Sequence, residues 1–248
     1  MSDTKHEIII RKVVAIITAA GKGERMNSPE KKQFILLGGK PIIIHTIKKF
    51  LKTNIFNKIH VTINPEDRKF AEKLFFVDYK LPEKKVIIVD GGKTRQQSVL
   101  SALEVISSDV DIVVIHDGVR PFIKIDEIIK VVDIAFKKGA VTLACPVKNT
   151  IKSIIDNQVF TTLNREQLWE IFTPQAFKFQ IIYDAHKQSL NKGFFANDDA
   201  ELVEKTGSSV FVVKGSPENI KITDEFDLKL AKAIVSKNIN NMQKNSDY

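Results

Sequence analysis

Two glycines and four basic side chains follow an apolar stretch near the N-terminus, a combination that can hold phosphate groups. Residues 13–20 (VVAIITAA) are apolar apart from Thr18, which predicts a strand that is buried on both faces. Gly21 and Gly23 end this run and permit tight turns and close approach of the backbone to a ligand. The basic residues of the loop are Lys22, Arg25, Lys31 and Lys32. Small residues and cations after a buried strand are typical of polyphosphate binding.

The spacing in this loop fits neither of two common phosphate-binding fingerprints. Gly-x-Gly-x-x-Gly fails because Met26 occupies the third glycine position, and no acidic residue follows about 20 positions later. A P-loop fails because the first glycine is not followed, at the required spacing, by Gly-Lys-Ser/Thr. Two interpretations remain: an ordinary strand-to-helix turn with surface lysines, and a nucleoside-triphosphate loop in which side-chain cations surround the phosphates.

Two further strand ends carry glycine beside polar side chains. Residues 90–92 (DGG) follow the predicted strand 85–89 (KVIIV), and residues 116–118 (HDG) follow the predicted strand 111–115 (DIVVI). The carboxylate of Asp117 could bind Mg²⁺ or hydroxyl groups, or it could cap the following turn. Because ligands bind beyond the carboxyl ends of parallel strands, three such ends together indicate a site more strongly than one alone.

Other polar residues near these strand ends could contact phosphate or a base. Arginine makes up only six of the 38 basic residues, which favours sites where a planar, bidentate fork is needed. Arg95 could meet phosphate or anchor its loop, and Ser98 with the glycine backbone could read the edge of a base. Lys221, flanked by Ile220 and Ile222, could contact phosphate or simply extend its ammonium group to solvent. For residues 197–199 (NDD), capping of the following helix is the preferred interpretation.

Several classes of chemistry lack their residues in this chain. No His, Cys and Asp cluster has metal-ligand spacing, and Gly-x-Ser-x-Gly is absent. Cys145 lies within an apolar stretch, which disfavours a nucleophilic role. Direct phosphoryl or nucleotidyl transfer remains, since its catalysis consists mostly of positioning and of neutralising charge.

Strand-like and helix-like stretches alternate along most of the chain. This pattern predicts an α/β fold, a mostly parallel sheet with helices on both faces. Phe70, Leu74 and Phe75 are expected on one face of the second helix, which begins at residues 64–66. The predicted strands are 13–20, 58–63, 85–89, 111–115, 140–145 and 209–213; helices are expected near 41–51, 64–75, 94–106, 124–137, 178–190, 198–205 and 224–234.

The regular alternation stops after Pro146. Short apolar runs surround Asp156 and Asn157, which predicts a β-hairpin in an arm at about residues 147–168. The arm could pack on a second subunit or run over the same domain, and its strand edges need cover. We expect one domain over residues 1–248, with a polar, frayed tail at 238–248.

Composition limits the partners. The net charge is +8, but the lysines are dispersed, so nucleic-acid binding is not expected. No apolar run approaches a membrane span, and residues 1–12 lack a signal-peptide core. The single cysteine excludes an internal disulfide framework. A cytoplasmic location is therefore expected.

Six motifs together resemble the 2-C-methyl-D-erythritol 4-phosphate cytidylyltransferase family. The motifs run in family order over residues 13–234, and HDGVRPF is the most specific of them. They are AAGKGERM with KKQF, DGGKTRQQSV, HDGVRPF, NREQLWEIFTPQAF, NDDAELVEKTG and NIKIT.

The resemblance implies a Rossmann-like nucleotidyltransferase fold and a reaction that joins CTP to a phosphorylated polyol. It also implies Mg²⁺, bound mainly through the CTP phosphates, and a homodimer formed through the arm. Arg25, Lys32, Arg165 and Lys221 would be catalytic, the first two at the α-phosphate. Cytidine would contact Ala19, Ala20, Gly21, Gly92 and Ser98. The polyol phosphate would contact Asp117, Thr173 and Lys221, with Thr150 and Arg165 reaching it from the arm of the partner subunit.

Some positions depart from the family pattern without removing a proposed cation. Lys31 stands where proline is common, Asn164 where aspartate is frequent and Asn197 where threonine occurs, and HDGVRP replaces HDAARP. Ribitol-5-phosphate cytidylyltransferase is an alternative, although Leu163-Asn164-Arg165 followed by Leu168-Trp169 looks more like the methylerythritol enzyme. A non-catalytic nucleotide- or phosphosugar-binding regulator is an alternative of a different class.

Overall fold

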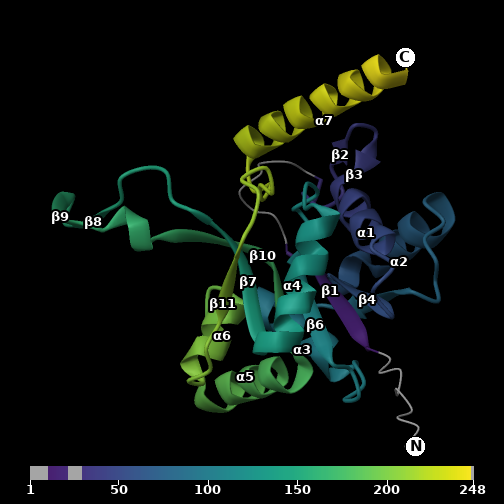
Figure 1. Ribbon diagram of the computed structural model, residues 1–248. Coiled ribbons are helices and arrows are strands. Elements are labelled where there is room, and N and C mark those ends of the chain that lie inside the picture. Colours follow the sequence, from purple (N-terminus) through teal and green to yellow (C-terminus); the bar gives the residue numbers. More distant parts are fainter. Residues whose placement is uncertain (1–10, 22–29, 247–248) are drawn as a thin grey trace, which may run out of the picture.

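A seven-stranded sheet forms the centre of the protein (Figure 1). The computed structural model describes residues 11–21 and 30–246, with side chains described through residue 237. In sheet order, the strands are β11 (Phe211–Lys214), β7 (Ala140–Pro146), β10 (Trp169–Lys178), β6 (Ile112–Asp117), β1 (Val13–Ala19), β4 (Lys58–Ile63) and β5 (Val86–Asp90). All neighbours pair in parallel except β10, which is antiparallel to both β6 and β7. The predicted mostly parallel sheet is confirmed.

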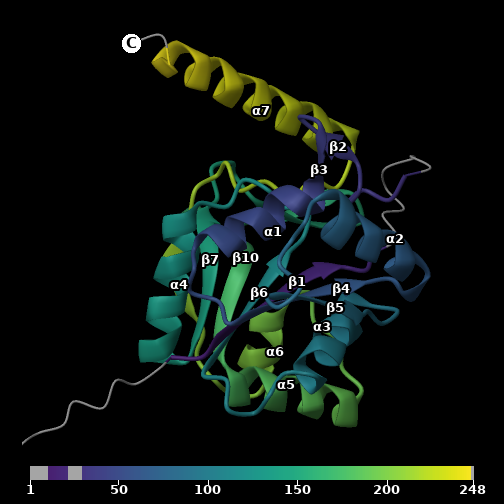
Figure 2. The ribbon, with the colours of Figure 1, turned by 90° about the vertical axis from the view of Figure 1, so that its right-hand side faces the viewer.

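Helices cover both faces of the sheet, as Figure 2 shows. Alternate residues of β1 point to opposite faces, because side chains of a strand alternate. Val13, Ala15 and Ile17 pack in one apolar cluster, and Val14 and Ile16 pack in the other. The first cluster includes residues of α1 (Ile42–Lys52), α2 (Arg68–Glu72) and α4 (Ile125–Lys138); the second includes residues of α3 (Arg95–Glu104), α5 (Phe179–Lys192) and α6 (Asp199–Lys205).

The central strand β10 was not expected from the sequence. Pro174 lies within it, and proline is normally excluded from interior strands because it cannot donate a backbone hydrogen bond. The strand accommodates the proline through a shift of register between Phe172 and Gln175 in its pairing with β7. The insertion of β10 between β6 and β7 brings Thr173 next to the end of β6.

The second predicted helix is broken into short pieces. A 3₁₀ turn (Pro65–Asp67) precedes α2, and a π-helical turn (Lys73–Asp78) follows it. Leu74 and Phe75 are buried as expected, but Phe70 is 52% exposed, so the three do not share one buried face. The Phe70 ring instead packs edge-on against Phe34, with ring centroids 4.9 Å apart.

The predicted hairpin is present and projects from the body of the protein (Figure 1). Strands β8 (Lys152–Ile155) and β9 (Gln158–Thr162) pair with each other in a separate two-stranded sheet. Asp156 and Asn157 connect them with φ values of 49° and 62°. Positive φ at both central residues is the feature of a type I′ hairpin turn, which explains why this dipeptide marked the arm.

The C-terminal helix α7 (Glu225–Ser246) is longer than expected. The sequence predicted a helix to residue 234 and a frayed tail from 238, but no glycine or proline interrupts residues 225–246 and the helix continues. Ala231 and Val235 pack with Leu37 of β2 (Leu36–Leu37), which pairs with β3 (Lys40–Pro41). Among the described residues, no helix has both the length and the apolar character needed to cross a membrane.

Candidate active site

Three strand ends converge on a cavity of about 430 Å³. Residues 18–21 at the end of β1, residues 91–94 after β5 and Asp117 at the end of β6 all line it. The other lining residues are Lys32, Gln33, Asn64, Pro65, Arg95, Ser98, Val119 and Lys221. The predicted Ala19, Ala20, Gly21, Gly92, Ser98, Asp117, Lys32 and Lys221 thus meet at one place. Arg25 lies outside the described residues.

The loop after β5 is held rigidly by the start of α3. Thr94 Oγ1 accepts a hydrogen bond from Gln97 N (3.1 Å), and Gln97 Oε1 accepts one from Thr94 N (3.3 Å), which forms a capping box. The Ser98 hydroxyl donates to Thr94 O (2.8 Å) and accepts from Gly92 N (3.1 Å). Ser98 therefore shapes the loop, and it also lines the cavity.

Gln33 is a site residue that sequence reasoning missed. Its side chain is buried, and its Nε2 donates to Ala19 O (2.8 Å) and Gly21 O (3.4 Å) at the end of β1. Neighbouring Lys31 forms an ion pair with Asp67 (2.7 Å), whereas Lys32 lines the cavity. The motif KKQF includes Gln33. However, a glutamine next to two lysines is expected at the surface, so the sequence did not indicate that the Gln33 amide is buried.

Asp117 is a buried carboxylate in contact with three cations. Oδ1 lies 3.2 Å from Arg95 Nε, and Oδ2 lies 3.0 Å from Lys221 Nζ and 3.3 Å from Arg120 Nε. Burial raises the pKa of Asp117, but Arg95, followed by Lys221 and Arg120, more than offsets burial and holds that pKa well below its usual value. Asp117 is therefore ionised across the neutral pH range.

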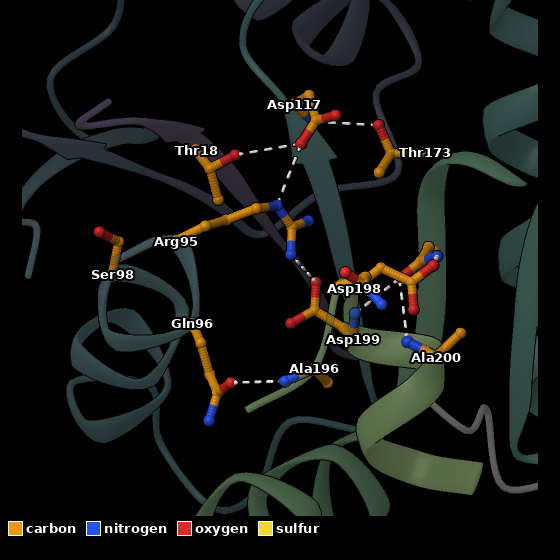
Figure 3. Close-up of polar contacts among 12 residues, drawn as sticks. Thr18, Arg95, Gln96, Ser98, Asp117, Thr173, Ala196, Asp198, Asp199 and Ala200 are labelled. Atoms are coloured by element: carbon orange, nitrogen blue, oxygen red, sulfur yellow. Dashed lines mark hydrogen bonds and ion pairs between the residues drawn. The ribbon is translucent and has the colours of Figure 1, made fainter. Parts of the chain in front are cut away.

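Arg95 joins Asp117 to a second buried carboxylate, Asp199 (Figure 3). Nη1 of Arg95 lies 2.7 Å from Asp199 Oδ2, and Asp199 Oδ1 lies 3.1 Å from Nε2 of the buried His186. Burial raises the pKa of Asp199, and Arg95 and His186 reverse this and lower it. Arg95 anchors its loop, as one of the two interpretations of the sequence held. Asp198 caps α6 as expected, but the ion pair of Asp199 was missed.

Thr173 and His116 fix the backbone behind Asp117. Thr173 Oγ1 accepts from Asp117 N (3.0 Å) and lies 3.0 Å from His116 Nδ1, while His116 Nε2 lies 3.2 Å from Arg120 O. Since a carbonyl only accepts, Nε2 carries the proton and Nδ1 accepts from the Thr173 hydroxyl. Burial lowers the pKa of His116 to about 4, so the ring is neutral and structural.

A second cavity, of about 500 Å³, adjoins the first. The two cavities share Arg95, Asp117 and Lys221 among their lining residues. The second cavity is also lined by Thr173, which was predicted to bind substrate, and by Arg120, whose Nη1 donates to Asn219 O (2.7 Å) and whose guanidinium lies over the Phe172 ring. The remaining lining residues are Thr142, Ile171, Phe172, Gln175, Asn197, Asp198, Ala200, Glu201, Glu204, Val210 and Val212.

The two predicted site residues of the arm do not reach either cavity within one chain. Thr150 and Arg165 are exposed, and Arg165 Nη1 donates to Lys148 O (3.0 Å). Both belong to the segment that leaves the body between β7 and β10. Of the twelve predicted residues, eleven are described; the structure brings nine of them together at the two cavities and leaves Thr150 and Arg165 apart.

The described residues do not form a metal cage. No group of three or more His, Cys, Asp or Glu in the described part of the chain could hold a metal ion. Asp117 is the one described carboxylate that lines the first cavity. A single carboxylate suits Mg²⁺ that arrives on a triphosphate and keeps phosphate oxygens and water as its other ligands.

Comparison with known proteins agrees with the resemblance seen in the sequence. A sequence profile described as 2-C-methyl-D-erythritol 4-phosphate cytidylyltransferase matches residues 13–237. Enzymes of that name from Geobacillus thermodenitrificans and Bacillus pumilus are 42% and 43% identical, over 91% and 89% of this chain and 97% and 95% of their own.

Solved structures show the same relationship. The 4-diphosphocytidyl-2C-methyl-D-erythritol synthase of Anaerococcus prevotii superposes with a TM-score of 0.81 at 30% identity, covering 92% of this chain and 99% of its own. The 2-C-methyl-D-erythritol 4-phosphate cytidylyltransferase of Francisella tularensis gives 0.73 at 32% identity, covering 89% and 98%. This chain therefore belongs to the 2-C-methyl-D-erythritol 4-phosphate cytidylyltransferase family.

Proposed function

We propose that the protein transfers CMP from CTP to 2-C-methyl-D-erythritol 4-phosphate and releases pyrophosphate. The observation that carries this proposal is the pair of adjoining cavities that share Arg95, Asp117 and Lys221. A phosphate oxygen of the polyol attacks the α-phosphorus of CTP; a new P–O bond forms and the bond from the α-phosphorus to the pyrophosphate oxygen breaks. The product is 4-diphosphocytidyl-2-C-methyl-D-erythritol.

The first cavity suits the nucleotide. Its floor is built from small residues, Ala19, Ala20, Gly21 and Gly92, whose backbone can approach the cytidine closely. Lys32 lies in the same cavity. We propose that Lys32 and Arg25 stabilise the negative charge that develops at the α-phosphate during transfer. Ser98 acts by fixing the loop through Gly92.

The second cavity suits the polyol phosphate. Asp117 is an acceptor for hydroxyl groups, and Thr173 lines the wall beside it. Lys221 lines both cavities, and its side chain is 37% exposed. Its ammonium group can therefore bind the polyol phosphate at the boundary between the two cavities. The positive charges around the shared boundary favour two phosphorylated substrates in contact.

Mg²⁺ is bound mainly through the CTP phosphates in this proposal, with Asp117 as the protein carboxylate available to it. The ion, when bound, neutralises charge on the triphosphate and favours departure of pyrophosphate. The protein's own cations neutralise the α-phosphate and the incoming phosphate.

A second copy of the chain covers the arm in this proposal. Ile154, Ile155, Val159 and Phe160 are exposed on β8 and β9, and Phe160 is 70% exposed. An isolated two-stranded hairpin with apolar side chains in water is marginally stable, which supports an arm exchanged between two subunits. Thr150 and Arg165, at the base of the arm, then reach the polyol phosphate of the partner subunit. A cytoplasmic location stays a prediction.

The test is release of pyrophosphate by the purified chain with CTP, Mg²⁺ and methylerythritol phosphate, coupled to an enzymatic pyrophosphate assay. We expect turnover that needs all three components, and a product mass equal to the sum of CMP and the polyol phosphate less water. Lys32→Ala serves as the control for a contaminating activity and should lose most turnover. Binding of CTP with no pyrophosphate release would instead indicate a non-catalytic nucleotide-binding protein.

A further inference from the structure

We propose that Arg95 is a positioning residue for Asp117, and that buried Asp199 and His186 hold Arg95 in place while Lys221 moves between Asp117 and substrate phosphate. The inference rests on the proposed function, because it assigns a division of labour among the cations around Asp117. Two of these cations are fixed and one is exchangeable.

The contacts of the three cations differ in kind. Arg120 is buried and held by Asn219 O and the Phe172 ring, and Arg95 is held by two carboxylates. Lys221 is more exposed, and among the described residues its ammonium group has Asp117 as its ion-pair partner. A flexible ammonium with one partner can leave that partner more easily than a guanidinium bound at two edges.

Arg95 is fixed by a chain of buried groups that begins far from it in sequence. Asp199, 104 residues away and only 1% exposed, accepts from Arg95 Nη1. The other oxygen of Asp199 meets His186 Nε2, and the Asp199 backbone N donates to Gln175 Oε1 (3.2 Å). The carboxylate of Asp199 lines neither cavity, and of its two side-chain partners, Arg95 and His186, Arg95 is the one that lines them.

This arrangement matters when Lys221 turns to a phosphate. Asp117 is then left in a buried site with one cation fewer, and an unpaired buried charge is costly. Arg95 Nε keeps its hydrogen bond to Asp117 Oδ1, which holds the carboxylate ionised and in the same orientation. Without a fixed Arg95, the Oδ1 edge of Asp117 loses its cation, and the carboxylate holds Lys221 more tightly and withdraws it from the substrate.

A purely structural role for the Arg95–Asp199 pair makes a different prediction. The pair would then serve to neutralise buried Asp199, and its loss would lower thermal stability without changing how the enzyme uses the polyol phosphate. The two roles are separated by comparing KM for each substrate, kcat and Tm in the same set of variants.

The test variant is Asp199→Asn, which keeps the shape and removes the charge. We expect KM for methylerythritol phosphate to rise and kcat to fall, with a roughly 10- to 100-fold lower kcat/KM, as for loss of a charge-assisted hydrogen bond. The dissociation constant of CTP, measured by calorimetry without the polyol, should stay near the wild-type value. Lys187→Gln is the matched control, because the Lys187–Glu104 ion pair joins α3 to α5, much as Arg95–Asp199 joins α3 to α6, but is exposed and away from both cavities.

Arg95→Lys gives the same result if Asp199→Asn fails to fold, since one ammonium group cannot hold two carboxylates in fixed directions. The proposal is overturned if the folded variants keep wild-type kcat/KM for the polyol phosphate, if CTP affinity falls by the same factor, or if Lys187→Gln loses as much. Absence of turnover in the wild-type protein would overturn the proposed function and the inference with it, whereas the outcomes above, in an active wild type, would overturn the inference alone.

Discussion

Gly91→Ala tests whether the loop after β1 and the loop after β5 pack against each other to form the nucleotide site. A Cβ on Gly91 would overlap the Cβ of Ala20 and would lie 3.0 Å from Ser98 Oγ and 3.4 Å from Ile63 O. Ile63 O is a backbone atom at the end of β4 and Ser98 is pinned by Thr94 and Gly92, so the strain falls on the loop after β1.

The size of the effect follows from the displacement that the overlap demands. Ordinary contact begins at 3.4 Å, so the two loops must separate by about 1 Å, and a misplacement of that size costs about 100-fold in rate when it reaches reacting groups. Overpacking costs about 1–3 kcal/mol of stability, which a domain of this size survives. We therefore expect kcat/KM for CTP to fall about 100-fold in a protein that still folds.

The assay is pyrophosphate release at varied CTP, with Tm measured on the same samples. Ala20→Gly removes the overlapping methyl, so the double variant Ala20→Gly/Gly91→Ala should recover much of the activity that Gly91→Ala loses. The single Ala20→Gly variant completes the double-mutant cycle. Wild-type kinetics in Gly91→Ala, or a double variant no better than the two single effects combined, would refute the packing of the two loops.

Two further predictions concern the arm and the pH dependence of stability. Mixing Arg165→Ala with Lys32→Ala chains should restore about a quarter of wild-type turnover if Arg165 acts across the interface. Half of the randomly mixed symmetric dimers then contain both variants, and each of these has one intact site out of two. Mixed dimers that are shown to form but have no activity would exclude action in trans. Burial lowers the pKa of His60 from 6.5 to about 4, so the unfolded chain takes up the proton first and stability falls as pH drops through that window. His60→Leu should flatten the slope of unfolding free energy by up to about 1.4 kcal/mol per pH unit between those values; an unchanged slope in urea unfolding would contradict this.

Local patterns in the sequence predicted most of the fold and much of the site. Glycines beside Asp90 and Asp117 marked the strand ends, and Asp156-Asn157 marked the arm, because each of these signals depends on residues that are adjacent in the chain. No comparable signal marked β10, since Pro174 interrupts its apolar pattern and the register shift that accommodates it forms only in the sheet.

The contacts that escaped prediction join residues distant in sequence. Arg95 and Asp199 meet because β10 lies between β6 and β7 and its Gln175 binds the start of α6. Gln33 was equally hidden, because burial of its amide depends on how the loop after β1 folds back. Neither contact follows from residue type or spacing, since both depend on the completed sheet.

The most direct test of the proposed function is a competition between two acceptors. Equal concentrations of methylerythritol phosphate and ribitol 5-phosphate are supplied with limiting CTP and Mg²⁺, and both cytidylylated products are quantified by mass spectrometry. We predict that the methylerythritol product dominates and that its amount equals the pyrophosphate released. A dominant ribitol product would contradict the assignment of substrate, and pyrophosphate without either product would contradict transfer to a polyol phosphate.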